Sequence, residues 1–261
     1  MHILISCAKT MANKVKPLSN GVVTKFTTPK YLEEASKIAL YMSQLTVDEL
    51  ETLLSVNNKI AVQNFKRYQI FHDQTNSIFP AISAYTGAVF KRIAPEDLSI
   101  EELLYAQRVL HITSFCYGLL RPLDCIKPYR LEGSVQLPHL CEGNLFEFWR
   151  DKLTADFVNE VKETGGQLCY LASEEMKRLF EWKRVENELK VVTPEFKVLK
   201  NGRWKTIVIY TKMCRGEMAR FIVQNKITHI EELKTFQWEG FVYNESLSTA
   251  SNLVFTSGQM L

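Results

Sequence analysis

The sequence predicts a mixed α/β fold in which helices surround a central sheet. Short, continuous apolar runs such as HILIS, from His2 to Ser6, are typical of buried central strands. Helix-start signals recur between residues 29 and 165, where a capping side chain precedes glutamate by three positions. No linker rich in Pro, Gly or Ser divides the 261 residues, so we expect a single compact domain over 1–261.

Helices are expected to fill most of the first two thirds of the chain. Thr28 and Pro29 provide a cap and a first-turn proline for an amphipathic helix that ends at about Gln44. Capping boxes predict later helix starts at Thr46 with Glu49, Ser99 with Glu102, Asn144 with Glu147, and Thr228 with Glu231. Gly165 and Gly166 are expected to end the helix that begins after Asn144.

The remaining third of the chain reads mainly as strands. The expected strands are QLCYLAS (167–173), LKVVTPEFKVL (189–199), RWKTIVIYT (203–211), and short ones near FVYN (241–244) and LVFTS (253–257). Asn201-Gly202 separates the second and third of these and is a strong signal for a tight hairpin. A further helix is expected to start at about Gly216.

Composition bears on location and on metal chemistry. No apolar run approaches the roughly 18 residues that a membrane span needs. The opening MHILISCAKT turns polar too early for a secretory signal, so we expect a cytoplasmic protein without a membrane partner. Its six cysteines lack CxxC spacing and predict reduced, mostly buried thiols: Cys7, Cys116, Cys125, Cys141, Cys169 and Cys214. No ligand set for a metal is visible, and we expect neither a metal nor a cofactor.

The charge of the chain is distributed unevenly. The formal net charge is only +3, but residues 1–30 contain five lysines and no acid. Residues 197–220 contain seven Lys or Arg against the single acid Glu217. These tracts suggest an anionic partner such as nucleic acid or a nucleotide, while a solvated surface is the alternative explanation.

The segment from His111 to Glu132 combines cations, acids and two prolines. Its first half is expected to continue an amphipathic helix. Pro122 and Pro128 remove backbone donors and disfavour helical geometry before them, which predicts a stiff, extended loop from Arg121 onward. Such a loop would present to a ligand Arg121, Asp124, Lys127, Tyr129, Arg130 and Glu132. The alternative is a surface connector whose charges only pair with one another.

Three expected strands end in ionisable or hydroxyl residues. If HILIS, CYLAS and IVIYT lie side by side and parallel, their carboxyl ends meet at one edge of the sheet, where open α/β sheets bind ligands. The candidates for this cleft are Ser6, Lys9, Thr10, Tyr85, Ser114, Tyr117, Arg121, Asp124, Tyr129, Arg130, Glu132, Ser173, Glu175, Lys212 and Arg215. A mainly cationic site suits phosphate, and Gly216 at a helix start would add backbone N–H groups. Glu132 and Glu175 are expected to stay ionised and to orient an arginine.

Ser6 and Lys9 have the S-x-x-K spacing of serine acyl-transfer enzymes. In those enzymes the motif opens a helix and works beside further motifs that this chain lacks. A nucleophilic serine is therefore kept only as a minor alternative. No catalytic residue is assigned.

LLSVNNKIA, residues 53–61, is similar to the turn of a helix-hairpin-helix element, which we place at about 46–69. Val56 takes the apolar position of the turn, while Ser55 and Asn57 stand where glycines are usual. Such turns bind DNA phosphates through backbone N–H groups and a lysine without reading sequence. The DNA-binding candidates are Ser55, Asn57, Lys59, Lys66 and Arg67. The alternative is an ordinary corner between two helices.

Five segments, taken together, resemble a known family. LISCAKT (4–10), YTGAVF (85–90), YGLLRPLDCIKPYRLE (117–132), LASEE (171–175) and CRGEMARF (214–221) look like the signature set of the bacterial YaaA family of peroxide-stress proteins, in that family's order. The similarity runs from Met1 to about residue 257. The chain departs from the family pattern at Phe115 (usually Gly), Gly133 (Met), Tyr170 (Asn), Met176 (Tyr) and Cys214 (Ala). None of these changes removes a charge.

Two functions remain open from the sequence. The resemblance implies a response to hydrogen peroxide that protects DNA and limits free intracellular iron. A binding protein of this kind would use the basic cleft and the helix-hairpin-helix-like element on duplex DNA, with little sequence preference. The alternative is an enzyme acting on a nucleobase or nucleotide in the cleft, for which a nucleotide or another phosphate-bearing small molecule is the expected partner.

Overall fold

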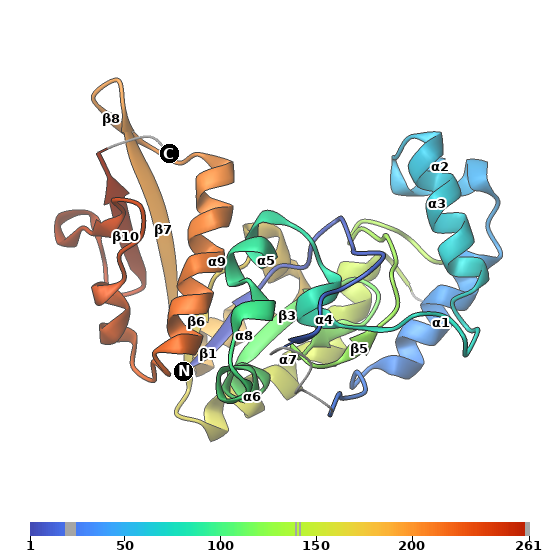
Figure 1. Ribbon diagram of the computed structural model, residues 1–261, viewed down its shortest axis with the longest axis horizontal. Helices are drawn as coiled ribbons and strands as arrows, with labels where there is room; N and C mark the ends of the chain where they lie inside the picture. Colours follow the sequence, from blue (N-terminus) through green and yellow to red (C-terminus); the bar gives the residue numbers. More distant parts are fainter. Residues whose placement is uncertain (19–24, 139, 141, 259–261) are drawn as a thin grey trace.

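The protein folds around one twisted sheet, as expected of the mixed α/β class. The structure, a computed structural model, describes residues 1–18, 25–138, 140 and 142–258 (Figure 1). Over these residues the strands are β1 (His2–Ile5), β2 (Phe79–Pro80), β3 (Leu110–Ser114), β4 (Gly118–Leu120), β5 (Cys125–Ile126), β6 (Gln167–Tyr170), β7 (Lys190–Lys200), β8 (Arg203–Lys205), β9 (Val242–Tyr243) and β10 (Asn252–Ser257). The described strands of the main sheet run in the order β4-β3-β1-β6-β7-β10-β9, and β8 pairs with β7.

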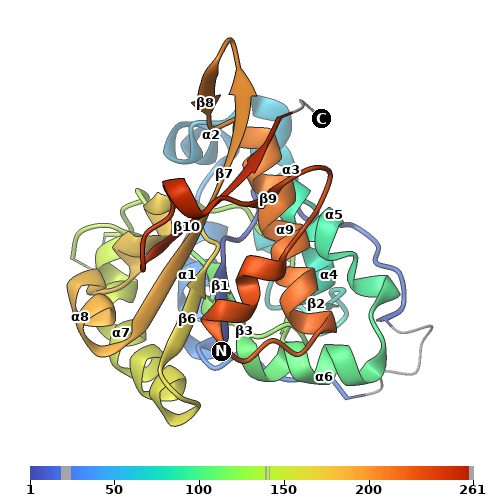
Figure 2. The same cartoon turned by 90° about the vertical axis from the view of Figure 1, so that its left-hand side faces the viewer.

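Helices cover both faces of the sheet. They are α1 (Leu32–Ser43), α2 (Val47–Leu54), α3 (Asn58–Gln69), α4 (Ala81–Ala84), α5 (Ala88–Ile93), α6 (Ile100–Val109), α7 (Leu145–Glu163), α8 (Trp182–Glu188) and α9 (Val208–Gln224), with 3-10 turns η2 (Pro95–Asp97), η3 (Glu174–Leu179), η4 (Ile230–Thr235) and η5 (Glu245–Leu247). Figure 2 shows α7 and α8 on one side of the strands and α5, α6 and α9 on the other. Helices α1 to α3 lie at one end of the long axis.

Parallel pairing sets the edge at which the site forms. β1 pairs in parallel with both β3 and β6, and β6 pairs in parallel with β7. All four residues of β1 are buried, as are those of β3. Covered on both faces, such strands must be apolar almost throughout, which explains why HILIS carries no alternating pattern.

Most of the expected helix boundaries are confirmed. The capping boxes of Thr46, Ser99 and Asn144 all form, and Gly165 and Gly166 take positive φ angles of 101° and 68° directly after α7. The Asn201-Gly202 hairpin also forms, with φ angles of 53° and 70°. Both angles are positive, as the tightest two-residue hairpin turn requires.

One expected boundary and one expected capping box are wrong. The helix expected from Pro29 begins at Leu32, because residues 30 and 31 form a turn. The capping box expected at Thr228 forms one residue later, between His229 and Glu232, and it starts the 3-10 turn η4 rather than an α-helix.

Two longer segments take a different structure from the expected one. Residues 110–114 form strand β3 rather than continuing a helix, because all five side chains are buried, as in a central strand covered on both faces. The β-branched run from Ile207 to Thr211 lies in and just before α9 instead of forming a strand. There, a buried stripe that includes Cys214, Met218 and Ile222 fixes the helix, and tertiary packing overrides β-propensity.

No helix in the described ranges combines the length and apolar character that crossing a bilayer requires. Five cysteines, at positions 7, 116, 125, 169 and 214, are free thiols, and three of them are buried. Cys141 lies outside the described residues.

Candidate functional site

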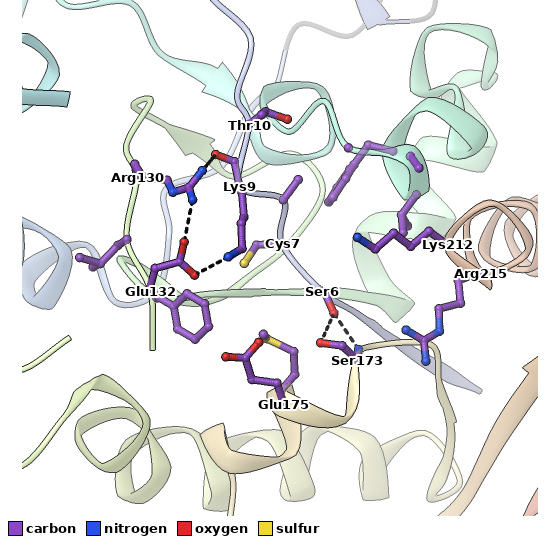
Figure 3. A pocket seen from close by; sticks show the side chains of 18 of the residues that line it. Ser6, Cys7, Lys9, Thr10, Arg130, Glu132, Ser173, Glu175, Lys212 and Arg215 are labelled. Atoms are coloured by element: carbon purple, nitrogen blue, oxygen red, sulfur yellow. Dashed lines mark hydrogen bonds and ion pairs between the residues drawn. The ribbon is translucent and has the colours of Figure 1, made fainter. Parts of the chain in front are cut away.

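A cavity of about 420 Å³ opens at the carboxyl ends of β1 and β6 (Figure 3). Of the residues expected at this edge, it brings together Ser6, Lys9, Thr10, Tyr129, Arg130, Glu132, Ser173, Glu175, Lys212 and Arg215. The remaining walls are mainly apolar. The cavity is therefore cationic at several points but mixed in lining, which suits a ligand that has both an apolar and an anionic part.

Ser6 and Ser173 join the ends of the two strands. The backbone N–H of Ser173 donates to Ser6 Oγ at 2.8 Å, and the two hydroxyl oxygens lie 3.2 Å apart. Tyr170 OH donates to the Ser173 carbonyl at 2.5 Å. These bonds hold Ser6 in place. The ammonium of Lys9 pairs with Glu132 instead, so the contact that S-x-x-K chemistry needs is not made in this structure.

Lys9, Arg130 and Glu132 form a charged cluster on one wall. Glu132 Oε2 lies 3.1 Å from Lys9 Nζ, and Oε1 lies 2.9 Å from an Arg130 terminal nitrogen. Arg130 also donates to the Lys9 carbonyl at 3.2 Å. Glu132 thus orients an arginine, as expected. Glu175 is exposed at the cavity, and no arginine pairs with it in the part of the chain that the structure describes.

Lys212 and Arg215 reach the cavity from the opposite wall, on the second and third turns of α9. Their expected placement at a strand end is wrong, because residues 208–224 are helical. Burial lowers the pKa of Arg215, and its Nε has no hydrogen-bond partner among the described residues. Gly216 is in mid-helix rather than at a helix start. A Cβ there would lie 2.3 Å from the Val89 carbonyl oxygen, so glycine allows α9 to approach α5.

A chain of buried hydroxyl groups lies behind the cavity wall. Tyr129 OH is 2.8 Å from Tyr85 OH and 2.7 Å from Ser114 Oγ. Ser114 Oγ also accepts the backbone N–H of Tyr117 at 2.9 Å. Burial raises the pKa of Tyr85 and Tyr129 well above the ordinary value, so both phenols stay neutral. Tyr85, Ser114 and Tyr117 thus support Tyr129 without lining the cavity themselves.

Arg121 and Asp124 lie away from the cavity, which corrects their expected placement. Arg121 donates to the Arg108 carbonyl at 3.0 Å and pairs with Glu160 on α7. Asp124 accepts a hydrogen bond from the Thr27 hydroxyl at 2.6 Å and another from the Arg121 backbone N–H at 2.7 Å. The stiff loop does form, but it starts at the far end of β4. Only its last residues, from Tyr129 to Glu132, reach the cavity.

Cys7 lines the cavity beside Ser6, but its thiol is not activated. Desolvation raises its pKa to about 12, and the carboxylates of Glu132 and Glu175 add to the effect. The reactive form of cysteine is the thiolate, so at neutral pH this group stays protonated. Burial also raises the pKa of the Cys116, Cys169 and Cys214 thiols.

Sequence reasoning missed the apolar lining. It includes Gly87 to Phe90, which belong to the quoted YTGAVF segment, together with Phe115, Leu131, Leu171 and Met176. Two departures from the family pattern meet here. A Cβ at Gly133 would lie 2.6 Å from the ring of Phe115 and 2.3 Å from that of Phe146, so Phe115 occupies space that a side chain at 133 would need.

The helix-hairpin-helix-like segment is a real pair of helices. Ser55 ends α2 in the left-handed conformation, with φ of 49°, and the Asn57 side chain accepts the backbone N–H of Ile60 at 3.0 Å. Lys59 and Lys66 are exposed. Arg67 is only partly exposed and turns toward Asn64 and Asn13, at 3.4 and 3.5 Å.

Among the described residues, no cluster of three or more His, Cys, Asp or Glu side chains is arranged to hold a metal ion.

Comparison with known proteins gives the family. The model of the peroxide stress protein YaaA family matches residues 1–247. A UPF0246 protein of Bacteroides thetaiotaomicron is 59% identical over 261 residues, and one of Bacteroides fragilis is 55% identical over 260 residues; each alignment covers 99% of both chains. The chain therefore belongs to the peroxide stress protein YaaA family.

Proposed function

We propose that this protein acts in the cytoplasm during peroxide stress by binding duplex DNA with little sequence preference and protecting it. Family membership supports the general role in peroxide stress. The α2–α3 unit is the observation that carries DNA binding. The proposal concerns binding along the phosphate backbone and requires no base-reading helix.

The turn between α2 and α3 has the features that a phosphate contact needs. N–H groups in the first turn of a helix lack partners within the helix. The Asn57 side chain satisfies that of Ile60, which leaves the backbone amides of Asn58 and Lys59 at the tip. Ser55 adopts the left-handed conformation in which glycine is usual, so its departure from the common pattern leaves the turn intact. Lys59 itself is exposed and belongs to the same first turn of α3.

The test is a double charge reversal, Lys59→Glu with Lys66→Glu, measured on two unrelated duplexes across a salt series. Wild-type affinity should fall steeply with salt, because phosphate contacts release counterions. The double variant should lose about tenfold or more in affinity on both duplexes alike. Both side chains are exposed, so the fold should be unchanged by circular dichroism.

A matched control reverses two exposed lysines elsewhere, Lys183 on α8 and Lys190 at the start of β7. It changes the net charge by the same amount. Equal losses in the two variants would mean that only overall charge matters. Equal affinity of the α2–α3 variant (Lys59→Glu with Lys66→Glu) and the wild type, or a flat salt dependence, would contradict binding through the turn between α2 and α3.

Limitation of free intracellular iron is the second part of the proposed role, and it rests on the family resemblance. Cells lacking the protein should contain more chelatable iron after peroxide treatment, and the wild-type gene should restore the level. Complementation with the α2–α3 variant (Lys59→Glu with Lys66→Glu) tells whether the effect on iron depends on DNA binding. Unchanged iron in cells lacking the protein would remove this part of the proposal.

The cavity favours a second candidate, an enzyme acting on a nucleobase or nucleotide. Arg215 and Lys212 on one wall suit a phosphate, because charge-assisted bonds from arginine to phosphate are strong and directional. The apolar lining with Phe115 and Met176 suits a base, and the Lys9–Glu132–Arg130 cluster adds a fixed polar group to the same cavity. The unpartnered Nε of Arg215 supports an anion at this wall.

Calorimetric titration with nucleoside monophosphates tests this candidate. Binding should be weakened by Arg215→Ala, and Arg121→Ala should have no effect because Arg121 lies outside the cavity. The absence of any heat from nucleotides, nucleosides or free phosphate would count against a nucleotide site.

A further inference from the structure

The α2–α3 unit is poorly charged for the task that we propose for it. Residues 46–69 contain three bases, Lys59, Lys66 and Arg67, and three acids, Asp48, Glu49 and Glu51. Arg67 is, in addition, turned toward Asn64 and Asn13. A unit without net charge gives little long-range attraction to a phosphate backbone. If this protein binds duplex DNA, a second part of its surface must supply positive charge.

The hairpin of β7 and β8 has that charge. From Phe196 to Gly216 the chain contains six Lys or Arg and no acid. Lys200, Arg203 and Lys205 near the hairpin tip are all exposed, and none forms an ion pair within the described ranges. Lys197, further down the strand, is already paired with Glu195 at 3.0 Å. The uncompensated cations are therefore concentrated at the tip.

Strand register places these three cations on one face. Lys200 pairs opposite Arg203, and Val198 opposite Lys205. Directly opposed residues in an antiparallel pair share a face, and so do alternate residues along a strand. The cationic face is thus the continuation of the face on which Val198 is buried. Three like charges so close together repel one another, which a phosphate backbone would relieve.

The other face of the tip carries Leu199 opposite Trp204. These side chains are 42% and 39% exposed, so the described residues leave both partly open to solvent. The tip is held by its own turn and by the pairing of β8 with β7. Its exposed aromatic ring makes the tip a place where fluorescence can report contact with a partner.

The β7–β8 hairpin and the α2–α3 unit, here called the two arms, project from the same side of the molecule. Figures 1 and 2 both show β8 and α2 toward the top of the view, and Figure 1 shows them toward opposite ends of the long axis. Helix α9 starts at Val208, just after β8, and its second turn carries Lys212, which lines the cavity. The basic tract therefore continues along the chain from the β7–β8 tip to the helix that lines the cavity.

We propose that the β7–β8 hairpin is a second duplex-binding arm, which holds the phosphate backbone through Lys200, Arg203 and Lys205 while α2–α3 holds it at the other end. This inference rests on the proposed DNA binding and assigns most of the electrostatic attraction to the β7–β8 arm. The partner is a duplex long enough to reach both arms. No base contact is required.

The test compares three double variants. They are the arm variant, Lys200→Glu with Arg203→Glu; the α2–α3 variant, Lys59→Glu with Lys66→Glu; and the control, in which Lys183 and Lys190 are reversed. Asn201 and Gly202 are left intact so that the turn still forms. The arm variant should lose about tenfold or more in affinity, and its plot of log affinity against log salt should be shallower by about 2. Duplex addition should change the tryptophan fluorescence of the wild type, and Trp204→Phe should remove that change.

The outcomes separate the two proposals. A loss of affinity in the arm variant that exceeds the loss in the control supports the arm, whether or not the α2–α3 variant also loses affinity. If the arm variant binds as tightly as the wild type while the α2–α3 variant loses affinity, the arm proposal is overturned and the proposed function stands. No binding of duplex by the wild type overturns both. A fluorescence change that persists in Trp204→Phe contradicts contact at the tip.

Discussion

At the scale of single residues, two ion pairs and a hydrogen bond to the Lys9 carbonyl hold the Lys9–Glu132–Arg130 cluster together. Arg130 and Glu132 are 15% and 19% exposed at the side chain, whereas Lys9 is 68% exposed. An exposed ammonium adds little to stability, so the pair of Glu132 with Arg130 is the one that matters. Glu132 therefore works mainly by fixing a guanidinium that would otherwise face the cavity without a counter-ion.

Replacing Glu132 with alanine should lower the free energy of unfolding by about 1–3 kcal/mol, because a largely buried guanidinium loses its charged partner. Urea unfolding measures the change. The matched control is Glu175→Ala, which removes an exposed carboxylate from the same cavity and should be close to neutral. Equal effects of the two changes would show that Glu132 is not special to the fold.

At the scale of elements, the crossing of α5 and α9 decides where Lys212 and Arg215 lie. Alanine favours helix over glycine by about 1 kcal/mol in a helix interior. Gly216→Ala should nevertheless destabilise the protein by about 1–3 kcal/mol, because the new Cβ would lie 2.3 Å from the backbone oxygen of Val89 and force the helices apart. Thermal unfolding measures this. Gly258→Ala, with open space around the position, is the control, and a stabilised Gly216→Ala would mean that the helices adjust freely.

The sequence predicted elements whose signals are local. Capping boxes at Thr46, Ser99 and Asn144 need only a side chain and a backbone within one turn, and the Asn201-Gly202 turn needs only permissive residues. The helix at Val208 could not be found this way. Its first turn is rich in β-branched residues, and its helical state depends on packing against α5, which is more than a hundred residues away in the chain.

The candidate site was predictable to the same extent. Ser6 and Ser173 meet because β1 and β6 are parallel neighbours, which the apolar runs suggested. Arg121 was misplaced because the position along a stiff loop does not tell which end faces the site. Composition and periodicity gave no signal for the apolar wall, since residues such as Val89 and Phe115 look like ordinary core in a single sequence, and only the family resemblance drew attention to them.

At the scale of the whole molecule, charge is arranged around the cavity rather than within one motif. The basic tract of residues 197–220 runs from the β7–β8 arm into α9, whose Lys212 and Arg215 line the cavity. The cations that we propose for duplex binding and those that line the cavity thus lie in one continuous basic tract of the chain.

The stability of the whole fold should depend on pH through a buried histidine pair. His2 Nδ1 lies 2.7 Å from His111 Nε2, between β1 and β3, and His2 Nε2 lies 2.7 Å from Thr164 Oγ1 at the end of α7. Burial, then the nearby Arg121 guanidinium, lower the pKa of His2 to about 4, and the same causes hold that of His111 well below its ordinary value. Both rings are therefore neutral in the folded protein at pH 7.

The sign follows from linkage. Between pH 6.5 and 4 the unfolded chain binds protons at these histidines and the folded protein does not, so stability falls as pH falls through this window. For His2 alone the full loss is about 3 kcal/mol. Urea unfolding at pH 7 and pH 5 should show the difference, and the double variant His2→Asn with His111→Asn should have a shallower dependence. The exposed His72, changed to Gln, is the control and should leave the dependence as it is. If the double variant shows the same dependence of stability on pH as the wild type, the two histidines take up no extra proton on unfolding. The acid sensitivity would then belong to carboxylates.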